Sequence, residues 1–152
     1  MRISTPCLVW KTCLFVFLSV PAYADGTGNI FVSNESDNTV SVINGETFEV
    51  IKTVHTGERP RDMRWHQGNT QLLIATSGSD RIEVLDVKTL EIVDFIEAGE
   101  DPEIFNIDPT GKILVAANED DNEVTVTDLN TGKRIRTIED VGIEPEGITF
   151  RN

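Results

Sequence analysis

The sequence has few of the residues that crosslinks and reactive sites need. Its only two cysteines are Cys7 and Cys13, and its only two histidines are His55 and His66. It lacks the Cys-x-x-Cys-His motif of covalent haem attachment. Its longest apolar run is Leu14–Val20. A membrane-spanning helix needs roughly 20 apolar residues, and this run is far shorter. These shortages exclude a disulfide framework downstream of Cys13 and argue against a c-type haem and a membrane-spanning helix.

The N-terminus has the pattern of a secretory signal. Arg2 and Lys11 precede the apolar run, and Ala22-Tyr23-Ala24 follows it as an Ala-x-Ala cleavage site. We therefore expect residues 1–24 to be a signal peptide and the exported chain to begin at Asp25. Both cysteines would then be lost, so thiol chemistry is not expected in the exported chain.

Acidic residues outnumber basic ones by two to one. The sequence has 26 Asp and Glu against 13 Lys and Arg. Loss of residues 1–24 removes Arg2 and Lys11 and no acidic residue, which makes the net charge −15. An acidic field repels phosphate backbones and anionic lipids. We expect neither a nucleic-acid partner nor a membrane partner after signal cleavage, and the charge favours either cationic partners or solubility alone.

A sequence repeat with a period of about 42 residues organises the rest of the chain, and this length is typical of one propeller blade. The motif Gly-x-x-Pro occurs as GERP, GEDP and GIEP, with one added residue before the third copy. Each copy has four short, alternating, β-branched runs. The sequence thus predicts an all-β fold, a β-propeller of four-stranded antiparallel blades. The aligned positions include Val40, Ile82 and Val124, then Asn44, Asp86 and Asp128, then Thr47, Thr89 and Thr131.

About three repeats are present, which is too few to close a ring. We place them at about 29–60, 61–102 and 103–145 within a propeller segment over 25–152, with the first strand of a further blade at 146–150. Closed propellers use about four to eight blades. Two interpretations remain open: the chain is a partial or open piece of a longer propeller, or two chains form a homodimer that closes a six-blade ring.

The loops of the predicted blades fall into two sets. Asn44, Asp86 and Asp128 are predicted to form Asx turns, in which the side chain accepts backbone hydrogen bonds. Each Gly-x-x-Pro should link the outermost strand of one blade to the innermost strand of the next. Strand alternation then places these links at the same end as the loops that follow the second strands, and we expect any ligand or partner there. The loops and links at that end are 33–38, 77–81 and 118–122, with 57–61, 99–103 and 142–146.

Three arginines interrupt the acidic pattern at the start of one inner strand. Arg61 aligns with Glu103 and Glu146 in the other repeats, and Arg59 and Arg64 flank it. The arginines either hold the carboxylate of a ligand or pair with carboxylates such as Glu103 across blades, and we favour internal pairing.

The remaining polar candidates give no catalytic constellation. Glu119, Asp120, Asp121 and Glu123 offer oxygen ligands, but their spacing is not that of a calcium loop, so a solvated turn is favoured over a metal site. His55 and His66 should lie at opposite ends of their blades, which leaves no triad or histidine-based metal site. Trp65 is predicted to pack in the core. The candidate partner face therefore comprises Arg59, Arg61, Arg64, Glu103, Glu119, Asp120, Asp121 and Glu146.

The strings FVSNESDNTVSVI, GERPRDMRW, SDRIEVLD, VAANEDDNEVTVTD and GIEPEGITF resemble YVTN-type β-propeller repeats. Within that group the chain is most similar to the PQQ-dependent catabolism-associated β-propeller proteins, and the resemblance covers nearly all of residues 29–152. WHQGN departs from the Ser-Pro-Asp-Gly turn that such repeats usually have.

The resemblance implies a periplasmic protein that accompanies quinoprotein alcohol dehydrogenases and a c-type cytochrome, with no enzymatic activity or cofactor of its own. We therefore expect a binding or scaffold protein whose partner is a quinoprotein dehydrogenase or a c-type cytochrome. The alternative is a propeller enzyme, such as a lactonase or a haem or quinone oxidoreductase, whose catalytic residues lie in blades outside this chain.

Overall fold

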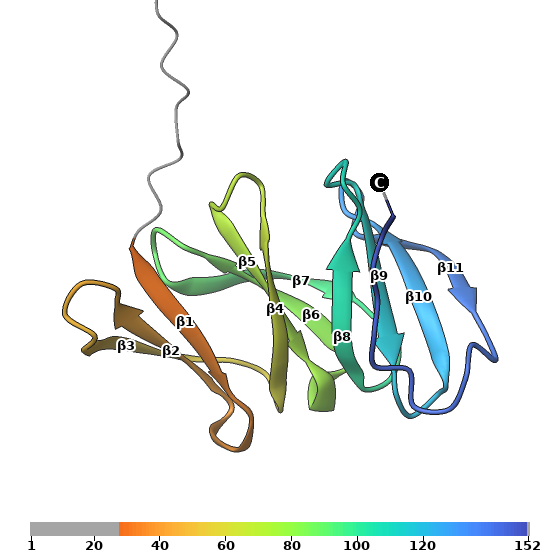
Figure 1. The fold of residues 1–152 in the computed structure, drawn as a ribbon, viewed down its shortest axis with the longest axis horizontal. Coiled ribbons are helices and arrows are strands. Elements are labelled where there is room, and N and C mark those ends of the chain that lie inside the picture. Colours follow the sequence, from red (N-terminus) through yellow and green to blue (C-terminus); the bar gives the residue numbers. More distant parts are fainter. Residues whose placement is uncertain (1–27, 152) are drawn as a thin grey trace, which may run out of the picture.

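The computed structural model describes residues 28–151, which form eleven strands in three antiparallel sheets (Figure 1). The predicted signal peptide, residues 1–24, lies outside this range. None of the described residues belongs to a helix that is long and apolar enough to cross a membrane. The arrangement confirms the predicted fold class, because the sheets stand side by side as blades of a partial propeller.

The sheets follow one another along the chain. In the first blade the order is β1 (Asn29–Asn34), β2 (Thr39–Asn44) and β3 (Val50–His55), with a short 3-10 turn, η1 (Glu35–Asp37), after β1. The second blade contains β4 (Pro60–His66), β5 (Gln71–Thr76), β6 (Arg81–Asp86) and β7 (Glu91–Glu97), with η2 (Ser77–Ser79) after β5. The third contains β8 (Pro102–Ile107), β9 (Ile113–Asn118), β10 (Glu123–Asp128) and β11 (Lys133–Ile138). The blades thus change at Pro60 and Pro102, as the repeat predicts.

The core lies between the blades because side chains of a strand alternate between its two faces. In β5, Leu73 and Ala75 pack toward the third blade with Phe105 and Leu114, and Leu72 and Ile74 pack toward the first blade with Val40. Each fully buried aliphatic or aromatic side chain contributes about 1.5–3 kcal/mol to folding. The two interfaces therefore hold the three blades in a fixed arrangement.

The predicted Asx turns are confirmed in all three blades. Asn44 Oδ1 accepts the backbone N–H groups of Glu46 and Thr47 at 2.8 and 2.9 Å. Asp86 and Asp128 accept the equivalent pairs of N–H groups in the second and third blades. The N–H of Thr89 is the main cause that holds the pKa of Asp86 below its usual value. These side chains therefore fix the turn that leads to the outermost strand of each blade.

Residues 146–150 form no strand, in contrast to the expectation of a further inner strand. The segment lies beside β8 instead, where Asn106 Nδ2 donates a hydrogen bond to the carbonyl of Ile148 at 3.2 Å (Figure 1). An inner strand needs the second strand of its own blade as a ladder partner, and residues 28–151 supply none there. The segment thus occupies the inner-strand position without the pairing that would make it a strand.

Candidate functional site: the loop face

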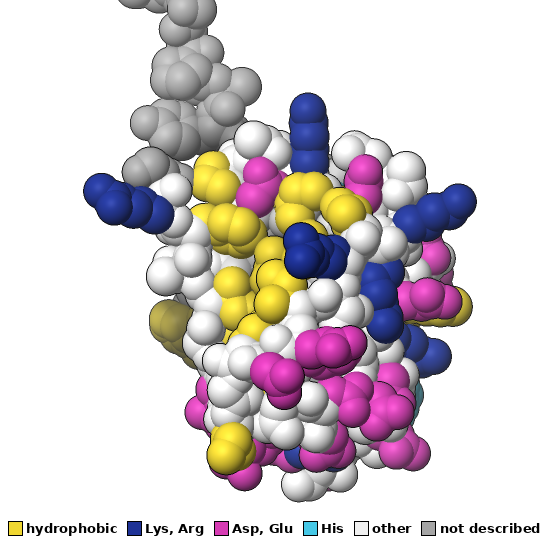
Figure 2. All heavy atoms as spheres, turned by 90° about the vertical axis from the view of Figure 1, so that its right-hand side faces the viewer, with side chains coloured by type: hydrophobic (Ala, Val, Ile, Leu, Met, Phe, Trp, Pro, Cys, Tyr) yellow, Lys and Arg dark blue, Asp and Glu magenta, His cyan; other side chains and the backbone are white. Residues whose placement is uncertain are grey.

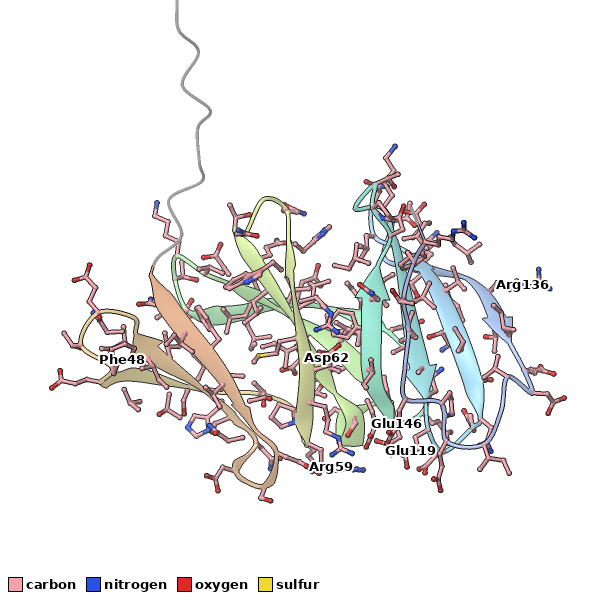
Figure 3. All side chains as sticks on the ribbon, viewed as in Figure 1. Phe48, Arg59, Asp62, Glu119, Arg136 and Glu146 are labelled. Carbon is pink, nitrogen blue, oxygen red and sulfur yellow. The ribbon has the colours of Figure 1, made fainter. Side chains whose placement is uncertain are left out.

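Six segments gather at one end of the blades and form what we call the loop face. They are the turns 35–38, 77–80 and 119–122 and the linkers 56–59, 98–101 and 139–144. Backbone hydrogen bonds join turns to linkers, for example from Ser77 N to the Arg59 carbonyl at 3.0 Å and from Glu119 N to the Asp101 carbonyl at 3.1 Å. Figure 3 labels two residues of the loop face, Arg59 and Glu119, and both lie toward the lower edge of that view. The prediction that the two loop sets share one end is therefore confirmed.

The same side-chain clasp repeats in every blade of the loop face. Asn38, Asp80 and Asn122 have φ angles of 55°, 54° and 55°. Asn and Asp adopt this left-handed conformation more readily than most residues. Each side-chain oxygen accepts the backbone N–H of a linker residue at 2.9 to 3.0 Å, and the donors in chain order are Arg59, Asp101 and Glu144. Each turn thus holds the linker that leads to the next blade, and the loop face is a rigid surface.

Two arginines and three carboxylates form an ion-pair network at the inner edge of this face. Arg59 lies 3.2 Å from Asp101, 3.3 Å from Glu103 and 3.4 Å from Glu35. Arg61 pairs with Glu35 at 3.0 Å and also with Glu103. Burial lowers the pKa of Arg59, but Asp101 and Glu35 outweigh it and hold that pKa above its usual value. The expected internal pairing of Arg61 with Glu103 is confirmed, and it leaves neither guanidinium free to hold an external carboxylate.

Arg64 does not join this network. It pairs with Asp62 at 2.7 Å, and the second Asp62 oxygen accepts the N–H of Phe105 at 3.3 Å. Burial raises the pKa of Asp62, while Arg64 and the Phe105 N–H oppose the rise. Figure 3 places Asp62 in β4, well away from the labelled Arg59 end. Asp62 therefore fastens the inner strands β4 and β8 together, and Arg64 serves as its partner.

The expectation for Trp65 is wrong, because 44% of this residue is exposed. Its ring makes an edge contact with Phe31, with 5.4 Å between centroids and 88° between planes. Together with Arg64 and His66 it borders a hollow of about 370 Å³.

Burial lowers the pKa of His66. His55 ends β3 beside the loop face, whereas His66 ends β4 at the opposite end of its blade, so the two histidines do not meet.

One acidic group lies close enough to share a cation. Within residues 28–151, only Asp101, Glu103 and Glu119 place one ligand atom each within 4.8 Å of one another. Asp101 and Glu103 are already paired with arginines, so a metal ion would have to displace guanidinium groups. Asp120 and Asp121 are exposed on their turn and do not join the group.

The candidate residues thus divide into three sets. Arg59, Arg61, Glu103 and Glu119 come together, Asp120, Asp121 and Glu146 face solvent, and Arg64 lies elsewhere. Two network members, Glu35 and Asp101, were not among the candidates. Asp101 occupies the same repeat position as Arg59. This reversal of charge between equivalent positions of neighbouring blades could have indicated that the two residues form an ion pair.

Charge is distributed unequally between the two ends of the blades. The six segments of the loop face carry twelve acidic residues and one basic residue, Arg59. The loops at the opposite end (45–49, 67–70, 87–90, 108–112 and 129–132) carry three acidic and two basic residues. Figure 2, a view of the third blade, shows acidic side chains gathered over the lower half of that side. The loop face is therefore a strongly negative surface at one end of a molecule whose other end is almost neutral.

Known proteins similar to this chain share its architecture. The family described as "Lactonase, 7-bladed beta-propeller" matches residues 28–145. A hydrazine synthase from Kuenenia stuttgartiensis has a TM-score of 0.70 at 21% identity, with 86% of this chain and 41% of that chain covered. Dihydro-heme d1 dehydrogenase NirN, in complex with DHE, has a TM-score of 0.63 at 16% identity over 76% of this chain and 25% of that one. The WD40 β-propeller domain of Doa1 has a TM-score of 0.63 at 17% identity over 74% of this chain and 37% of that one.

The structural matches show the fold alone, and the chain spans less than half the length of each of these structures. No curated protein matches the chain. The family match covers most of residues 28–151 and agrees with the blades and linkers described above. The chain therefore belongs to the lactonase family of seven-bladed β-propellers.

Proposed function

We propose that this chain belongs to an exported, non-catalytic β-propeller that acts as a binding or scaffold protein, and that its loop face binds a basic protein partner. The supporting observation is the charge asymmetry, twelve acidic residues against one basic residue on the loop face. A surface of one sign attracts and orients a partner of the opposite sign and raises its association rate.

Rigidity supports the same proposal. The clasps of Asn38, Asp80 and Asn122 hold the turns against the linkers, so the acidic groups are presented on a preformed frame. A preformed surface loses less conformational freedom when it binds a partner. The network of Arg59 and Arg61 neutralises the inner carboxylates, and this leaves the exposed acids of the turns, such as Asp120 and Asp121, to meet the partner.

The cellular setting of the proposal comes from the sequence. The signal pattern over residues 1–24 favours export, and the resemblance to YVTN-type and PQQ-associated propellers favours the periplasm. The partner that fits both the setting and the charge is a basic c-type cytochrome, with a quinoprotein dehydrogenase subunit as the other member of that setting.

The test is a binding measurement between the exported chain and a purified basic c-type cytochrome, at low and high salt. We expect the affinity to fall steeply with ionic strength, because exposed charges are screened beyond a Debye length of about 10 Å at 0.1 M salt. The double variant Asp120→Asn/Asp121→Asn should weaken binding several-fold through a slower association rate.

The matched control is Glu46→Gln/Glu49→Gln, which removes the same charge from the opposite end. It should leave the affinity within a factor of two of the unaltered chain. Equal weakening by both double variants would reduce the effect to net charge and refute a specific loop face. Absence of binding to the cytochrome at low salt would refute the proposed partner.

The family match supports one alternative, a propeller enzyme that opens lactones. Within residues 28–151, Asp101, Glu103 and Glu119 are the carboxylates that lie close enough together to hold a metal ion for lactone opening. Incubation with a panel of lactones, with the acid released by ring opening as the readout, separates the two functions. Turnover that Glu103→Gln abolishes would establish the enzyme and overturn the non-catalytic proposal.

A further inference from the structure

A hollow of about 230 Å³ lies between the second and third blades, at the end opposite the loop face. We call it the junction slot. Both blades that border it have all four strands, so its two walls are complete. Its apolar lining belongs to the core cluster between these blades and consists of Leu73, Val84, Ile96 and Leu129.

The turn before the outermost strand has the same backbone in every blade. Phe48, Leu90 and Gly132 occupy one repeat position in it, with φ angles of 58°, 56° and 66°. Each of their N–H groups donates to the carbonyl of the Asx residue four positions earlier, at 2.8 Å. The three turns therefore differ at this position only in the side chain that they present.

That side chain explains the junction slot. Leu90 packs against the cluster between the first and second blades, where the repeat equivalents of Val84, Ile96 and Leu129 are Val42, Val54 and Val87. Gly132 has no side chain, and a Cβ added to it meets nothing within 4 Å. Protein interiors are close-packed and hold few voids larger than a water molecule. The slot is therefore the place that a leucine side chain occupies at the preceding junction.

A second substitution weakens the packing on the same side. Thr127 stands at the repeat position of Leu85, which belongs to the cluster between the first and second blades. Thr127 is fully buried two residues before Leu129, and its hydroxyl has no hydrogen-bond partner within residues 28–151. Buried polar groups are rarely left unpaired. The core beside the slot is thus less complete than its counterpart one blade earlier.

The rim of the slot is polar but carries little charge. Its hydrogen-bonding side chains include an imidazole and three amides, which belong to His66, Gln67, Gln71 and Asn130. Burial lowers the pKa of His66, so its imidazole is mostly neutral at pH 7. The carboxylate at the slot, Asp94, accepts the N–H of Phe95 at 2.8 Å. An apolar hollow with a few polar groups around it is the usual form of a ligand site, and this rim suits uncharged amides.

We propose that the junction slot binds a leucine side chain of an uncharged peptide segment from another protein, with the amides of the rim bonded to the peptide backbone. Leu90 shows that the equivalent space accepts this side chain. The near-neutral loops around the slot favour an uncharged segment. The inference goes beyond the proposed function and does not rest on it, because the slot and the loop face lie at opposite ends of the blades.

The first test is an NMR titration of the exported chain with the capped pentapeptide Gly-Ser-Leu-Ser-Gly. We expect shifts of the amide signals of residues 129–132. The peptide with alanine in place of leucine should bind at least about tenfold more weakly, because three buried carbon atoms are lost at roughly a factor of four each. Absence of shifts at millimolar peptide, or equal affinity for both peptides, overturns the site. N-acetyl-leucinamide that binds as tightly as the pentapeptide overturns the peptide as the ligand.

The second test fills the slot from within. Gly132→Leu should abolish binding of the leucine peptide, because its side chain takes the place that Leu90 takes at the preceding junction. Gly132→Ala is the matched control: it needs the same left-handed backbone but leaves most of the slot empty, so its affinity should stay within about threefold of the unaltered chain. Binding that survives in both variants, or is lost in both, overturns the proposal.

Urea unfolding of the same two variants tests the slot without a ligand. Both variants place a side chain at a positive φ, so that strain is shared, and only leucine fills the hollow. Gly132→Leu should therefore unfold at a higher urea concentration than Gly132→Ala. An equal or lower midpoint would mean that the hollow does not accept a leucine side chain, and it overturns the proposal.

Discussion

Replacement of Glu103 by glutamine tests whether the ion-pair network stabilises the junction between the second and third blades. The Glu103 side chain is 8% exposed and pairs with Arg59 and Arg61, whose side chains are 44% and 29% exposed. Loss of one partner from a fully buried pair costs about 3–5 kcal/mol, and loss of an exposed pair costs about 0–1 kcal/mol. Since the arginines reach solvent, we expect an intermediate loss of about 1–2.5 kcal/mol.

The assay is urea unfolding of the exported chain followed by circular dichroism. With a denaturant dependence of about 1–3 kcal/mol per molar urea, the midpoint should fall by roughly 1 M with little change in slope. Exposed Glu100→Gln, two residues before Pro102, is the control. It should stay within about 0.5 kcal/mol of the unaltered chain.

A double-mutant cycle with Arg61→Ala isolates the pair itself. The side chains of Arg61 and Glu103 are in contact. For residues in contact we expect a coupling free energy of at least about 0.5 kcal/mol. A Glu103→Gln loss no larger than that of Glu100→Gln, or strictly additive effects in the cycle, would refute the idea that this network stabilises the junction.

Two further predictions concern the linkers and turns. A Cβ at Gly99 overlaps the buried Asn118 amide, whereas one at Gly147 meets nothing within 4 Å. Gly99→Ala should therefore lower the free energy of unfolding by about 1–3 kcal/mol and Gly147→Ala should change little in the same urea assay; equal effects would contradict this. The Thr110 hydroxyl and nearby backbone N–H groups hold the pKa of Asp108 at about 2. Because this pKa is depressed in the folded chain, its stabilisation is present above the unfolded value of about 3.9 and is lost as the pH falls toward 2. NMR titration of the carboxyl carbon should show this, and Asp108→Asn should flatten the pH dependence of unfolding between pH 4 and 2; a midpoint near 3.9 would contradict it.

The repeat made the blades predictable because each one is a local structure. Strand, turn and strand follow one another closely in the sequence, so alternation and Asx chemistry specify them without knowledge of distant contacts. The Asx turns at Asn44, Asp86 and Asp128 are the clearest example. The shared end of the two loop sets follows from strand count alone, and the structure has it.

Contacts between blades were harder to foresee. The clasp from Asp80 to the Asp101 N–H joins residues 21 positions apart, and the sequence showed only that Asn38, Asp80 and Asn122 share a repeat position. The exposure of Trp65 and the missing strand at 146–150 depend on what packs beside an inner strand, which neither residue type nor period encodes.

The loop face consists of two zones with different roles. At its inner edge, Arg59 and Arg61 neutralise carboxylates that neighbouring blades bury, so charge there is balanced and serves cohesion. At its rim, Asp120 and Asp121 are exposed, and no ion pair within residues 28–151 involves either of them. Arg61→Ala should therefore lower stability while it leaves cytochrome affinity unchanged. The double variant Asp120→Asn/Asp121→Asn should weaken cytochrome binding while it leaves stability unchanged. If both changes lowered stability and cytochrome affinity together, the inner edge and the rim would act as one site.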